Sequence, residues 1–181
     1  EPLSLYVHLP FCARLCLFCG CTVEITHRAD RVERYLAALE REISAVAQLL
    51  RTRRRVAQLH WGGGTPTHLT VAHIRRLHAD LAAHFTFEPG AEISIEVHPH
   101  VTSAEQVDVL TELGFDRFSM GVQDTDPHVQ AVIHRDQTVE ETAALVAHCR
   151  ARGVKSVNLD LMYGLPEQNE RTFERTLADV G

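Results

Sequence analysis

The chain has 181 residues, of which 45% are hydrophobic and 23% are charged. This length and composition predict one globular domain or part of one. The 18 basic and 24 acidic residues give a net charge of −6. A negative charge argues against general binding of nucleic acid or of an anionic membrane, because both need a basic surface. No apolar run approaches the length of a membrane span.

Strand and helix patterns alternate five times along the chain. The expected strands are residues 5–9, 56–61, 91–97, 115–122 and 156–162. The expected helices begin near Asp30, Thr70, Ser103, Thr138 and Asn169. Three of these starts read as capping boxes, namely Asp30 with Glu33, Ser103 with Gln106, and Thr138 with Glu141. Such alternation predicts a parallel sheet joined by right-handed crossovers.

Within each expected strand, apolar and polar residues alternate. One face carries Val7, Leu9, Ala57, Leu59, Trp61, Ile93, Ile95, Val97, Phe118, Met120, Val122, Val157, Leu159 and Leu161. The other carries Tyr6, His8, Gln58, His60, Gly62, Ser94, Glu96, His98, Ser119, Gly121, Gln123, Asn158 and Asp160. Because an unpaired buried polar group costs about 1–3 kcal/mol, the polar face must meet water, a ligand or other polar groups.

We therefore expect an α/β fold, a partial TIM-like barrel of parallel strands with about five βα units and a wet interior. The alternative is an antiparallel sheet with one solvated face, which the helices between the strands make less favourable. Chemistry in α/β barrels sits at the carboxyl ends of the strands. Residues 12–21, residues 62–65, Glu96, Gln123 and Asp160 fall at the ends of five successive strands, which predicts a single site.

Four of the five cysteines lie between Cys12 and Cys21. Soft thiolate sets select zinc, Cu(I) or iron–sulfur clusters. A structural zinc site usually needs a second pair of ligands, and Cys149 is isolated, although His8 and His27 flank the loop and could complete a site. Disulfides suit short, cysteine-dense secreted domains. Free thiolates indicate a reducing compartment, so we expect a cytoplasmic protein.

The C-x3-C-x2-C spacing of Cys12, Cys16 and Cys19 resembles the cluster loop of radical S-adenosylmethionine (SAM) enzymes. In that superfamily three cysteines hold a [4Fe-4S] cluster whose fourth iron is chelated by SAM. The glycine run at residues 62–64 resembles the motif that holds the methionyl amino group of SAM. Taken alone, this run fits a tight strand-to-helix turn better.

A narrower resemblance covers essentially all 181 residues. The segments Tyr6–Cys12, Cys19–Cys21, His60–Thr67, Glu92–Val97, Ser119–Asp124 and Asp160–Pro166 resemble, in order, the oxygen-independent coproporphyrinogen III oxidase (dehydrogenase) family. The resemblance covers only the catalytic barrel of that family. It therefore implies that residues 1–181 form one incomplete domain, truncated on the C-terminal side and lacking the N-terminal arm.

The resemblance implies a role for each matching residue. Cys12, Cys16 and Cys19 would ligate the cluster. The positions that contact SAM, of which the family binds two molecules, are Tyr6, Phe18, Gly63, Gly64, Thr65, Glu96, Gln123, Arg135 and Asp160. Cys21 is an extra cysteine near the cluster, and His8 would lie near the cluster and the substrate, so both are catalytic candidates.

The implied reaction is an oxidative decarboxylation in heme biosynthesis. A 5′-deoxyadenosyl radical from SAM would take hydrogen from propionate side chains of coproporphyrinogen III, and loss of CO2 and one further electron would leave vinyl groups. Two turnovers would give protoporphyrinogen IX. The implied partners are the porphyrinogen and an electron-donor protein or other reductant, with no nucleic acid and no membrane, and we expect a monomer.

Some residues depart from the family pattern, and two other functions remain open. His98, His100 and His134 stand where other residues are usual in the family. One alternative is a heme-binding chaperone that shares the barrel and the cluster, although Gly20-Cys21 and the Gly121–Asp124 segment favour the enzyme. The other alternative is a structural zinc module.

Overall fold

The computed structural model describes residues 1–181, and its centre is one parallel five-stranded sheet. The sheet has the order β1-β4-β5-β6-β7, with β1 Leu3–Leu9, β4 Arg55–Gly63, β5 Thr86–Val97, β6 Arg117–Gln123 and β7 Ser156–Leu161. The longer helices are α1 Ala29–Leu49, α2 Val71–His84, α3 Ala104–Glu112, α5 Val139–Ala151 and α6 Glu170–Val180. The shorter elements are β2 Phe11–Cys12, β3 Glu24–Ile25, α4 Pro127–Val132 and the 3-10 helix Pro66–His68.

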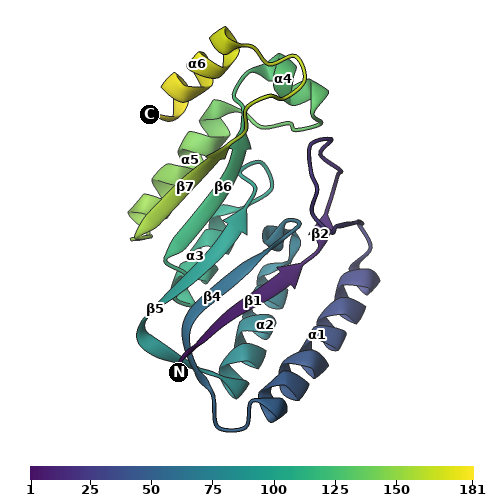
Figure 1. The fold of residues 1–181 in the computed structure, drawn as a ribbon, viewed down its shortest axis with the longest axis vertical. Coiled ribbons are helices and arrows are strands. Elements are labelled where there is room, and N and C mark those ends of the chain that lie inside the picture. The colour runs from purple at the N-terminus through teal and green to yellow at the C-terminus, as the bar shows by residue number, and fades with distance from the viewer.

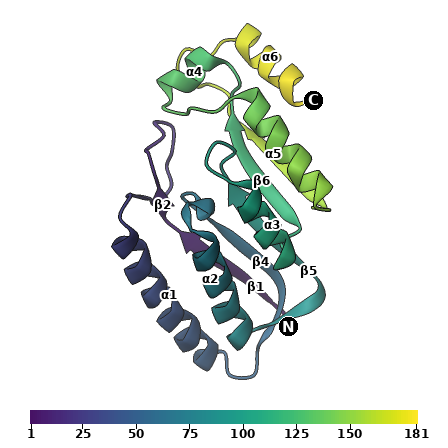
Figure 2. The same cartoon turned by 180° about the vertical axis from the view of Figure 1, so that it is seen from behind.

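The two faces of the sheet are covered differently. Successive strands pair in parallel, for example Leu5 with Leu59 and Leu59 with Ile93. Helices α1, α2, α3 and α5 lie on one face, whereas the opposite face is open (Figures 1 and 2). This arrangement confirms the predicted α/β partial barrel of five βα units.

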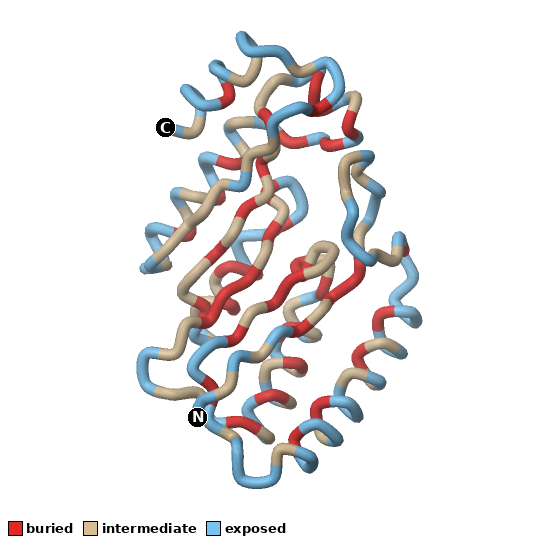
Figure 3. Tube along the Cα trace, in the orientation of Figure 1, coloured by how far each residue is buried: buried red, intermediate tan, exposed pale blue.

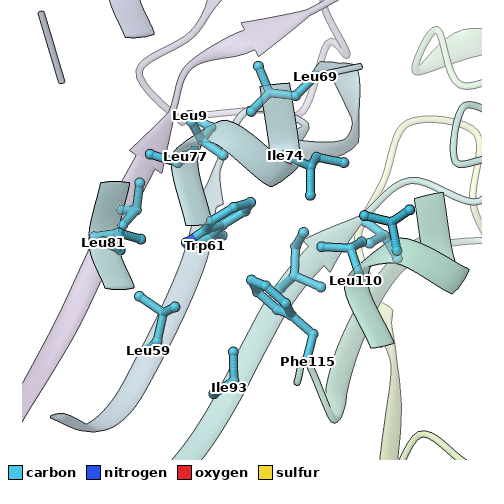
Figure 4. Close-up of a cluster of buried hydrophobic side chains, with 14 of the residues drawn as sticks. Leu9, Leu59, Trp61, Leu69, Ile74, Leu77, Leu81, Ile93, Leu110 and Phe115 are labelled. Carbon is cyan, nitrogen blue, oxygen red and sulfur yellow. The ribbon is translucent and has the colours of Figure 1, made fainter. Parts of the chain in front are cut away.

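A cluster of 26 buried apolar residues fills the space between the sheet and the helices. Figure 4 shows Leu59 and Trp61 of β4 pointing toward Leu77 and Leu81 of α2. The ring of Trp61 is fully buried and meets Phe115 edge to face, with ring centroids 4.9 Å apart. The buried residues follow the strands and the inner sides of the helices, and the outer sides of the helices are exposed (Figure 3).

One member of the predicted apolar face is misplaced. Ala57 is exposed, and the preceding Val56 is fully buried instead. The pairing of β4 with β5 shifts register between Val56 and Gln58, so an irregularity interrupts the alternation at this point. The prediction for Ala57 is therefore wrong, because strict period two cannot anticipate a bulge.

The predicted helix starts are confirmed, but the capping box predicted at Asp30 does not form. Capping boxes form at Ser103 and Thr138 as predicted, and also at Thr70 and Asn169. Helix α1 instead begins after Arg28, whose side chain makes no cap. Arg28 donates to both oxygens of Asp30 at 3.0 and 2.8 Å, which occupies the carboxylate that was predicted to cap the helix.

Four short elements were not predicted, namely β2, β3, α4 and the 3-10 helix Pro66–His68, and all four lie beside the carboxyl ends of the strands. Strands β2 and β3 pair with each other on either side of the cysteine loop. Helix α4 begins with Pro127 after Asp126, whose carboxylate accepts from the amides of His128 and Val129.

No helix combines the length and the apolar character that crossing a bilayer requires.

Candidate functional site

A cavity of about 640 Å³ lies between the cysteine loop and the carboxyl ends of the strands. Twelve of the fourteen predicted site residues line it, namely Cys12, Cys16, Phe18, Cys19, Cys21, Gly63, Gly64, Thr65, Glu96, Gln123, Arg135 and Asp160. Tyr6 and His8 of β1 are not part of the lining. The structure thus brings residues from the cysteine loop and from four strands or the turns that follow them to one place.

The cysteine loop is attached at both ends and at its tip. At its ends, the amide of Glu24 donates to the carbonyl of Pro10 at 2.7 Å, and that of Thr26 donates to Cys12 at 3.0 Å. At its tip, the amide of Leu17 donates to the carbonyl of Ile133, directly after α4, at 3.0 Å. Figure 1 shows the loop extending beyond β2 toward α4. The segment that follows α4 therefore holds the loop at its tip.

The donor set of the loop fits an iron–sulfur cluster. Cys12, Cys16 and Cys19 are free and half-buried. Burial raises the pKa of the Cys12 thiol, a hydrogen bond from Thr65 opposes this rise, and the neighbouring thiolates of Cys16 and Cys19 add to it. No three His, Cys, Asp or Glu side chains converge on one point, as a single metal ion would need. A [4Fe-4S] cluster offers a separate iron to each cysteine, so it does not need such convergence.

A buried cation stands beside these thiols. Arg135 directs Nη1 to Sγ of Cys16 at 4.0 Å, while its Nη2 donates to the carbonyl of Gly121. Its Nε donates to the side chain of Gln137 at 3.2 Å, which fixes the plane of the guanidinium. The positive charge compensates in part for the negative charge that three thiolates would gather.

The glycine turn packs directly on the chain that leads to the first cysteine. The amide of Gly64 donates to Leu9 O at 2.9 Å, and that of Thr65 donates to Phe11 O at 2.8 Å. A Cβ at Gly64 would lie 2.8 Å from backbone atoms of Pro10 and Phe11. Gly63 has a φ of +118°, and a Cβ there would lie 2.7 Å from the ring of His8. The glycines therefore allow the turn to approach the cysteine loop closely.

Glu96 at the end of β5 is held in its ionised form. One carboxylate oxygen accepts from the amide of Gly63 at 3.1 Å, and the other faces Nε2 of His60 at 3.3 Å. The hydrogen bond from His60 holds the pKa of Glu96 below its ordinary value, although burial opposes this effect. The carboxylate can thus accept hydrogen bonds from a ligand at neutral pH.

The ends of β6 and β7 supply further polar groups. Gln123 has a φ of +70°, a left-handed conformation that ends β6 beside the cavity. A Cβ at Gly121 would lie 2.8 Å from Nε2 of Gln123 and 3.0 Å from Nη2 of Arg135, so this glycine leaves room for both side chains. Asp160 accepts from the hydroxyl of Ser119 at 2.8 Å, and both side chains line the cavity.

Three histidines outside the family pattern also line the cavity. Burial lowers the pKa of His98 to about 3, and the charges of Arg135 and His100 add to the effect, so His98 is neutral at pH 7. His100 contacts Glu141 at 3.1 Å, and His134 has a left-handed backbone with a φ of +58°. These positions were recognised in the sequence as departures, but sequence reasoning assigned them no role.

Tyr6 and His8 form a separate polar pair beneath the glycine turn. Nε2 of His8 faces the carbonyl of Thr22 at 2.9 Å, and Nδ1 faces the hydroxyl of Tyr6 at 3.0 Å. Because a carbonyl only accepts, Nε2 of His8 donates to the carbonyl of Thr22. His8 is thus held at both ring nitrogens between β1 and the end of the cysteine loop.

Comparison with known proteins gives consistent matches over nearly the whole chain. The model of the Radical SAM superfamily matches residues 6–180. The oxygen-independent coproporphyrinogen III oxidase of Salmonella typhimurium is 49% identical over 180 residues, which is 99% of this chain and 39% of the relative. The enzyme of the same description from Pseudomonas aeruginosa is 44% identical over 99% of this chain and 40% of the relative.

Solved structures agree with the sequence matches. A structure of Escherichia coli coproporphyrinogen III oxidase, described as a radical SAM enzyme, has a TM-score of 0.95 and 49% identity. This chain covers 41% of that structure, and the match covers 99% of this chain. The radical SAM methyltransferase TsrM of Kitasatospora setae has a TM-score of 0.66 at 16% identity, over 98% of this chain and 32% of the other, which shows a shared fold.

The chain therefore spans about two fifths of the length of these curated relatives. The resemblance seen in the cysteine loop and the strand ends is confirmed, as is the radical SAM type of partial barrel. The [4Fe-4S] cluster and SAM follow as the cofactors of this superfamily. With its family model matched from residue 6 to residue 180, the chain belongs to the radical SAM superfamily.

Proposed function

We propose that this chain is the catalytic barrel of an oxygen-independent coproporphyrinogen III oxidase, acting in heme biosynthesis. The observation that carries the proposal is the cavity at the strand ends, where twelve of the predicted site residues meet. The 49% identity to relatives of that description, over 99% of this chain, supports the same substrate. The proposal includes residues 1–181 as one incomplete domain of the longer enzyme.

The residues of the cavity divide into two groups by chemistry. Cys12, Cys16 and Cys19 would hold the cluster, with Arg135 near the sulfur of Cys16. The proposed contacts with SAM come from Phe18, Gly63, Gly64, Thr65, Glu96, Gln123, Arg135 and Asp160 in the cavity, and from Tyr6 on β1 outside its lining. When bound, the cluster would supply an electron to SAM, and SAM would supply the radical that takes hydrogen from a propionate; loss of CO2 and of one further electron, to an electron acceptor, would then leave a vinyl group.

The protein's own part is to orient and to shield. The glycine turn brings backbone groups close to the cysteine loop, where the methionyl end of SAM would lie. The Glu96 and Asp160 carboxylates can accept from ribose hydroxyls, and the Gln123 and Arg135 side chains can meet the ribose or the methionyl carboxylate. A second SAM molecule is part of the proposal, because the resembled family binds two.

The catalytic candidates and the partners complete the proposal. His8 is hydrogen-bonded at both ring nitrogens, so we expect it to position groups rather than to transfer a proton. Cys21 is exposed next to the cluster loop and lines the cavity. The partners would be coproporphyrinogen III and a reductant, for a monomer in the cytoplasm that binds neither nucleic acid nor membrane.

Anaerobic reconstitution of the chain with iron and sulfide tests the proposed cluster and its use of SAM. We expect about four irons and four sulfides per chain, and cleavage of SAM to 5′-deoxyadenosine with a strong reductant. Bound zinc without sulfide would support the structural zinc module instead. The matched variant is Cys149→Ala, which changes a buried cysteine on α5 outside the cavity and should leave the iron content unchanged.

An assay with coproporphyrinogen III and SAM, in the absence of oxygen, tests the proposed substrate and reaction. Vinyl product detected by mass spectrometry supports the enzyme. Tight binding of heme without turnover would support the chaperone. Because relatives are longer than this chain, the same assay is run in parallel on the full reading frame.

A further inference from the structure

Two buried glutamines lie on either side of Arg135 in the sequence. Gln130 on α4 is 5% exposed, and Gln137 after α4 is 6% exposed. Neither residue lines the cavity or belongs to the predicted site. A buried side-chain amide needs partners for its oxygen and for its nitrogen, since each unpaired group costs about 1–3 kcal/mol. The partners of these two amides connect the end of β6 to the guanidinium of Arg135.

Gln130 ties Gln137 to the residue that follows β6. Its Oε1 accepts from the backbone amide of Gln137 at 2.9 Å, and its Nε2 donates to the backbone carbonyl of Asp124 at 2.6 Å. A backbone amide only donates and a carbonyl only accepts, so both contacts require the same orientation of the Gln130 side chain. Asp124 is itself fully buried, which makes it a fixed point for this attachment.

Gln137 holds the guanidinium. Its Oε1 accepts from Nε of Arg135 at 3.2 Å, and its Nε2 donates to Oγ1 of Thr142 on α5 at 2.9 Å. Because a guanidinium only donates, the oxygen of Gln137 is the atom that faces Arg135. The Thr142 hydroxyl donates in turn to the carbonyl of Thr138 at 3.1 Å, so the far end of Gln137 is anchored at the start of α5.

The backbone of this segment brings the two glutamines together. Helix α4 has only six residues, and a helix this short is not stable by itself. His134 follows it with a left-handed backbone, and the amide of Arg135 donates to the carbonyl of Gln130 at 2.9 Å. The chain therefore turns back toward α4, and the amide of Gln137 reaches the side chain of Gln130.

The guanidinium of Arg135 has one contact from each of its nitrogens. Nη2 donates to the carbonyl of Gly121, and Nη1 lies 4.0 Å from Sγ of Cys16, which is long even for a hydrogen bond to sulfur. Nε donates to Gln137. Because the guanidinium is planar, its orientation toward Cys16 is set by the two shorter contacts, and only the one at Nε comes from a side chain.

We propose that Gln137 and Gln130 are positioning residues for Arg135. Gln137 orients the guanidinium so that Nη1 faces Cys16 and the cavity, and Gln130 holds Gln137 by tying it to the end of β6. The ligand that Arg135 meets, the ribose or the methionyl carboxylate of SAM, rests on the proposed function. The orientation of the guanidinium does not.

Proton exchange at Nε of Arg135 tests this orientation in the cluster-free chain. Nitrogen-15 NMR measures the exchange with water, and the signal is assigned by its loss in Arg135→Lys. We expect slow exchange in the unmodified chain and exchange about tenfold faster in Gln137→Met, which replaces the amide by a thioether, a weak acceptor. Unchanged exchange in Gln137→Met would overturn the proposal.

Two further readouts separate positioning from a general loosening of this segment. The amide of Leu17, which donates to the carbonyl of Ile133, should keep its protection against hydrogen exchange in Gln137→Met. Loss of protection at Leu17 as well would mean local unfolding and would overturn the specific role of Gln137. Gln137→Glu keeps an acceptor for Nε and should restore slow exchange at Arg135, and failure to restore it would count against the proposal.

The part assigned to Gln130 is tested separately. In Gln130→Met the backbone amide of Gln137 loses its acceptor and should exchange faster, and exchange at Nε of Arg135 should rise by less than in Gln137→Met. An unchanged amide of Gln137 would contradict this part. If Gln137→Met does not fold, Gln130→Met and Gln137→Glu still decide the outcome.

The matched control is Gln106→Met. Gln106 on α3 is also buried, and its Nε2 donates to the carbonyls of Thr67 and Leu69 at 2.8 Å. Its substitution removes a buried amide of the same kind without touching the segment after α4. We expect exchange at Nε of Arg135 to stay slow, and an increase equal to that in Gln137→Met would overturn the proposal.

Binding of SAM to the cluster-loaded chain supplies the last readout. We expect Gln137→Met to weaken the affinity about tenfold, Gln130→Met to weaken it less, and Gln106→Met to leave it unchanged. Equal affinities of Gln137→Met and the unmodified chain would overturn the role in positioning Arg135 for the ligand. If the unmodified chain does not bind SAM, the proposed function fails, and the exchange measurements still decide whether the two glutamines orient Arg135.

Discussion

The two faces of the central sheet are built from the same five strands but serve different purposes. On β4, Leu59 and Trp61 point toward the helices and are fully buried, whereas the intervening His60 and the following Gly62 face the ligand side. The helix side is stabilised by burial of apolar area, which needs no particular partner. The open side is connected by directional hydrogen bonds between partly exposed groups, which contribute little to stability.

This division predicts that substitutions on the two faces separate stability from ligand binding. A change on the helix side should lower the free energy of unfolding and leave the cavity chemistry intact in the folded fraction. A change on the open side should alter the cavity chemistry and leave the free energy of unfolding nearly unchanged. Four experiments test the division, in order of decreasing expected effect.

The largest effect is expected from Cys16→Ser. A serine hydroxyl does not replace a thiolate at an iron, so the iron content should fall to near zero and cleavage of SAM should fall to background. The urea midpoint of the cluster-free chain should not change. Iron analysis and circular dichroism measure both.

The control is Cys149→Ala on α5. Burial raises the pKa of Cys149 to about 11, so this thiol is inert at neutral pH. We expect full iron content and a loss of about 1 kcal/mol in stability, from the lost packing of a small side chain. Full iron incorporation by Cys16→Ser would contradict the assignment of the cluster ligands.

The next effect is the loss of stability in Trp61→Ala. Removing this buried ring beside Phe115 should cost about 3–5 kcal/mol in the free energy of unfolding. Gln58→Ala, on the exposed side of the same strand, should change it by less than about 0.5 kcal/mol.

Urea unfolding followed by circular dichroism measures both variants. If Trp61→Ala does not fold, Ile95→Val tests the same face, since Ile95 is fully buried and the change should cost about 0.5–1.5 kcal/mol. An equal loss in the free energy of unfolding on the helix side and in Gln58→Ala would refute the division between the two faces.

A smaller effect is expected from Gly64→Ala. The new Cβ would lie 2.8 Å from the backbone of Pro10 and Phe11, so the glycine turn must move away from the cysteine loop. We expect a loss of about 1–3 kcal/mol and a lower iron content. Gly20→Ala is the control in the loop itself, where a Cβ meets nothing within 4 Å. Equal results for both variants would show that close packing of the turn is unimportant.

The smallest effect concerns pH and Glu96→Gln. Because the pKa of Glu96 is lowered by the hydrogen bond from His60, the carboxylate adds stability above the ordinary carboxyl pKa of about 4.3. That contribution is lost as the pH falls through the lowered pKa of the folded state. Since Glu96 is 45% exposed, we expect a difference of only a few tenths of a kcal/mol.

Urea unfolding of the cluster-free chain at pH 7 and at pH 3 tests this sign. The unmodified chain should be more stable than Glu96→Gln at pH 7, and this difference in the free energy of unfolding should shrink at pH 3. A difference that grows toward low pH would mean that burial, rather than the bond from His60, dominates the pKa of Glu96.

Prediction from sequence succeeded where the signal was local and repeated. Period-two alternation located the strands, and the polar residue pairs at Ser103 and Thr138 located two helix starts through their capping boxes. It failed at Ala57, where a bulge in the pairing changes which residue faces the core. It also failed at Asp30, because a side chain outside the expected motif took the carboxylate.

The cysteine spacing, the glycine run and the strand-end polar residues could all be read from the chain, because each is a short pattern with its own chemistry. The support of the loop by the segment after α4 could not, since Leu17 and Ile133 are far apart in sequence and their hydrogen bond leaves no mark in either segment. The same holds for Arg135 beside Cys16 and for His60 between Ser94 and Glu96.

The sequence by itself determined the alternating βα architecture, the two chemically different faces of the sheet and the identity of the cluster loop, because these depend on spacing within short segments. Only the tertiary structure decided which side chains meet across strands, how the segment after α4 holds the loop, and which groups hold Glu96. Those features depend on contacts between residues tens of positions apart, whose distances and hydrogen-bond directions exist only once the sheet has formed.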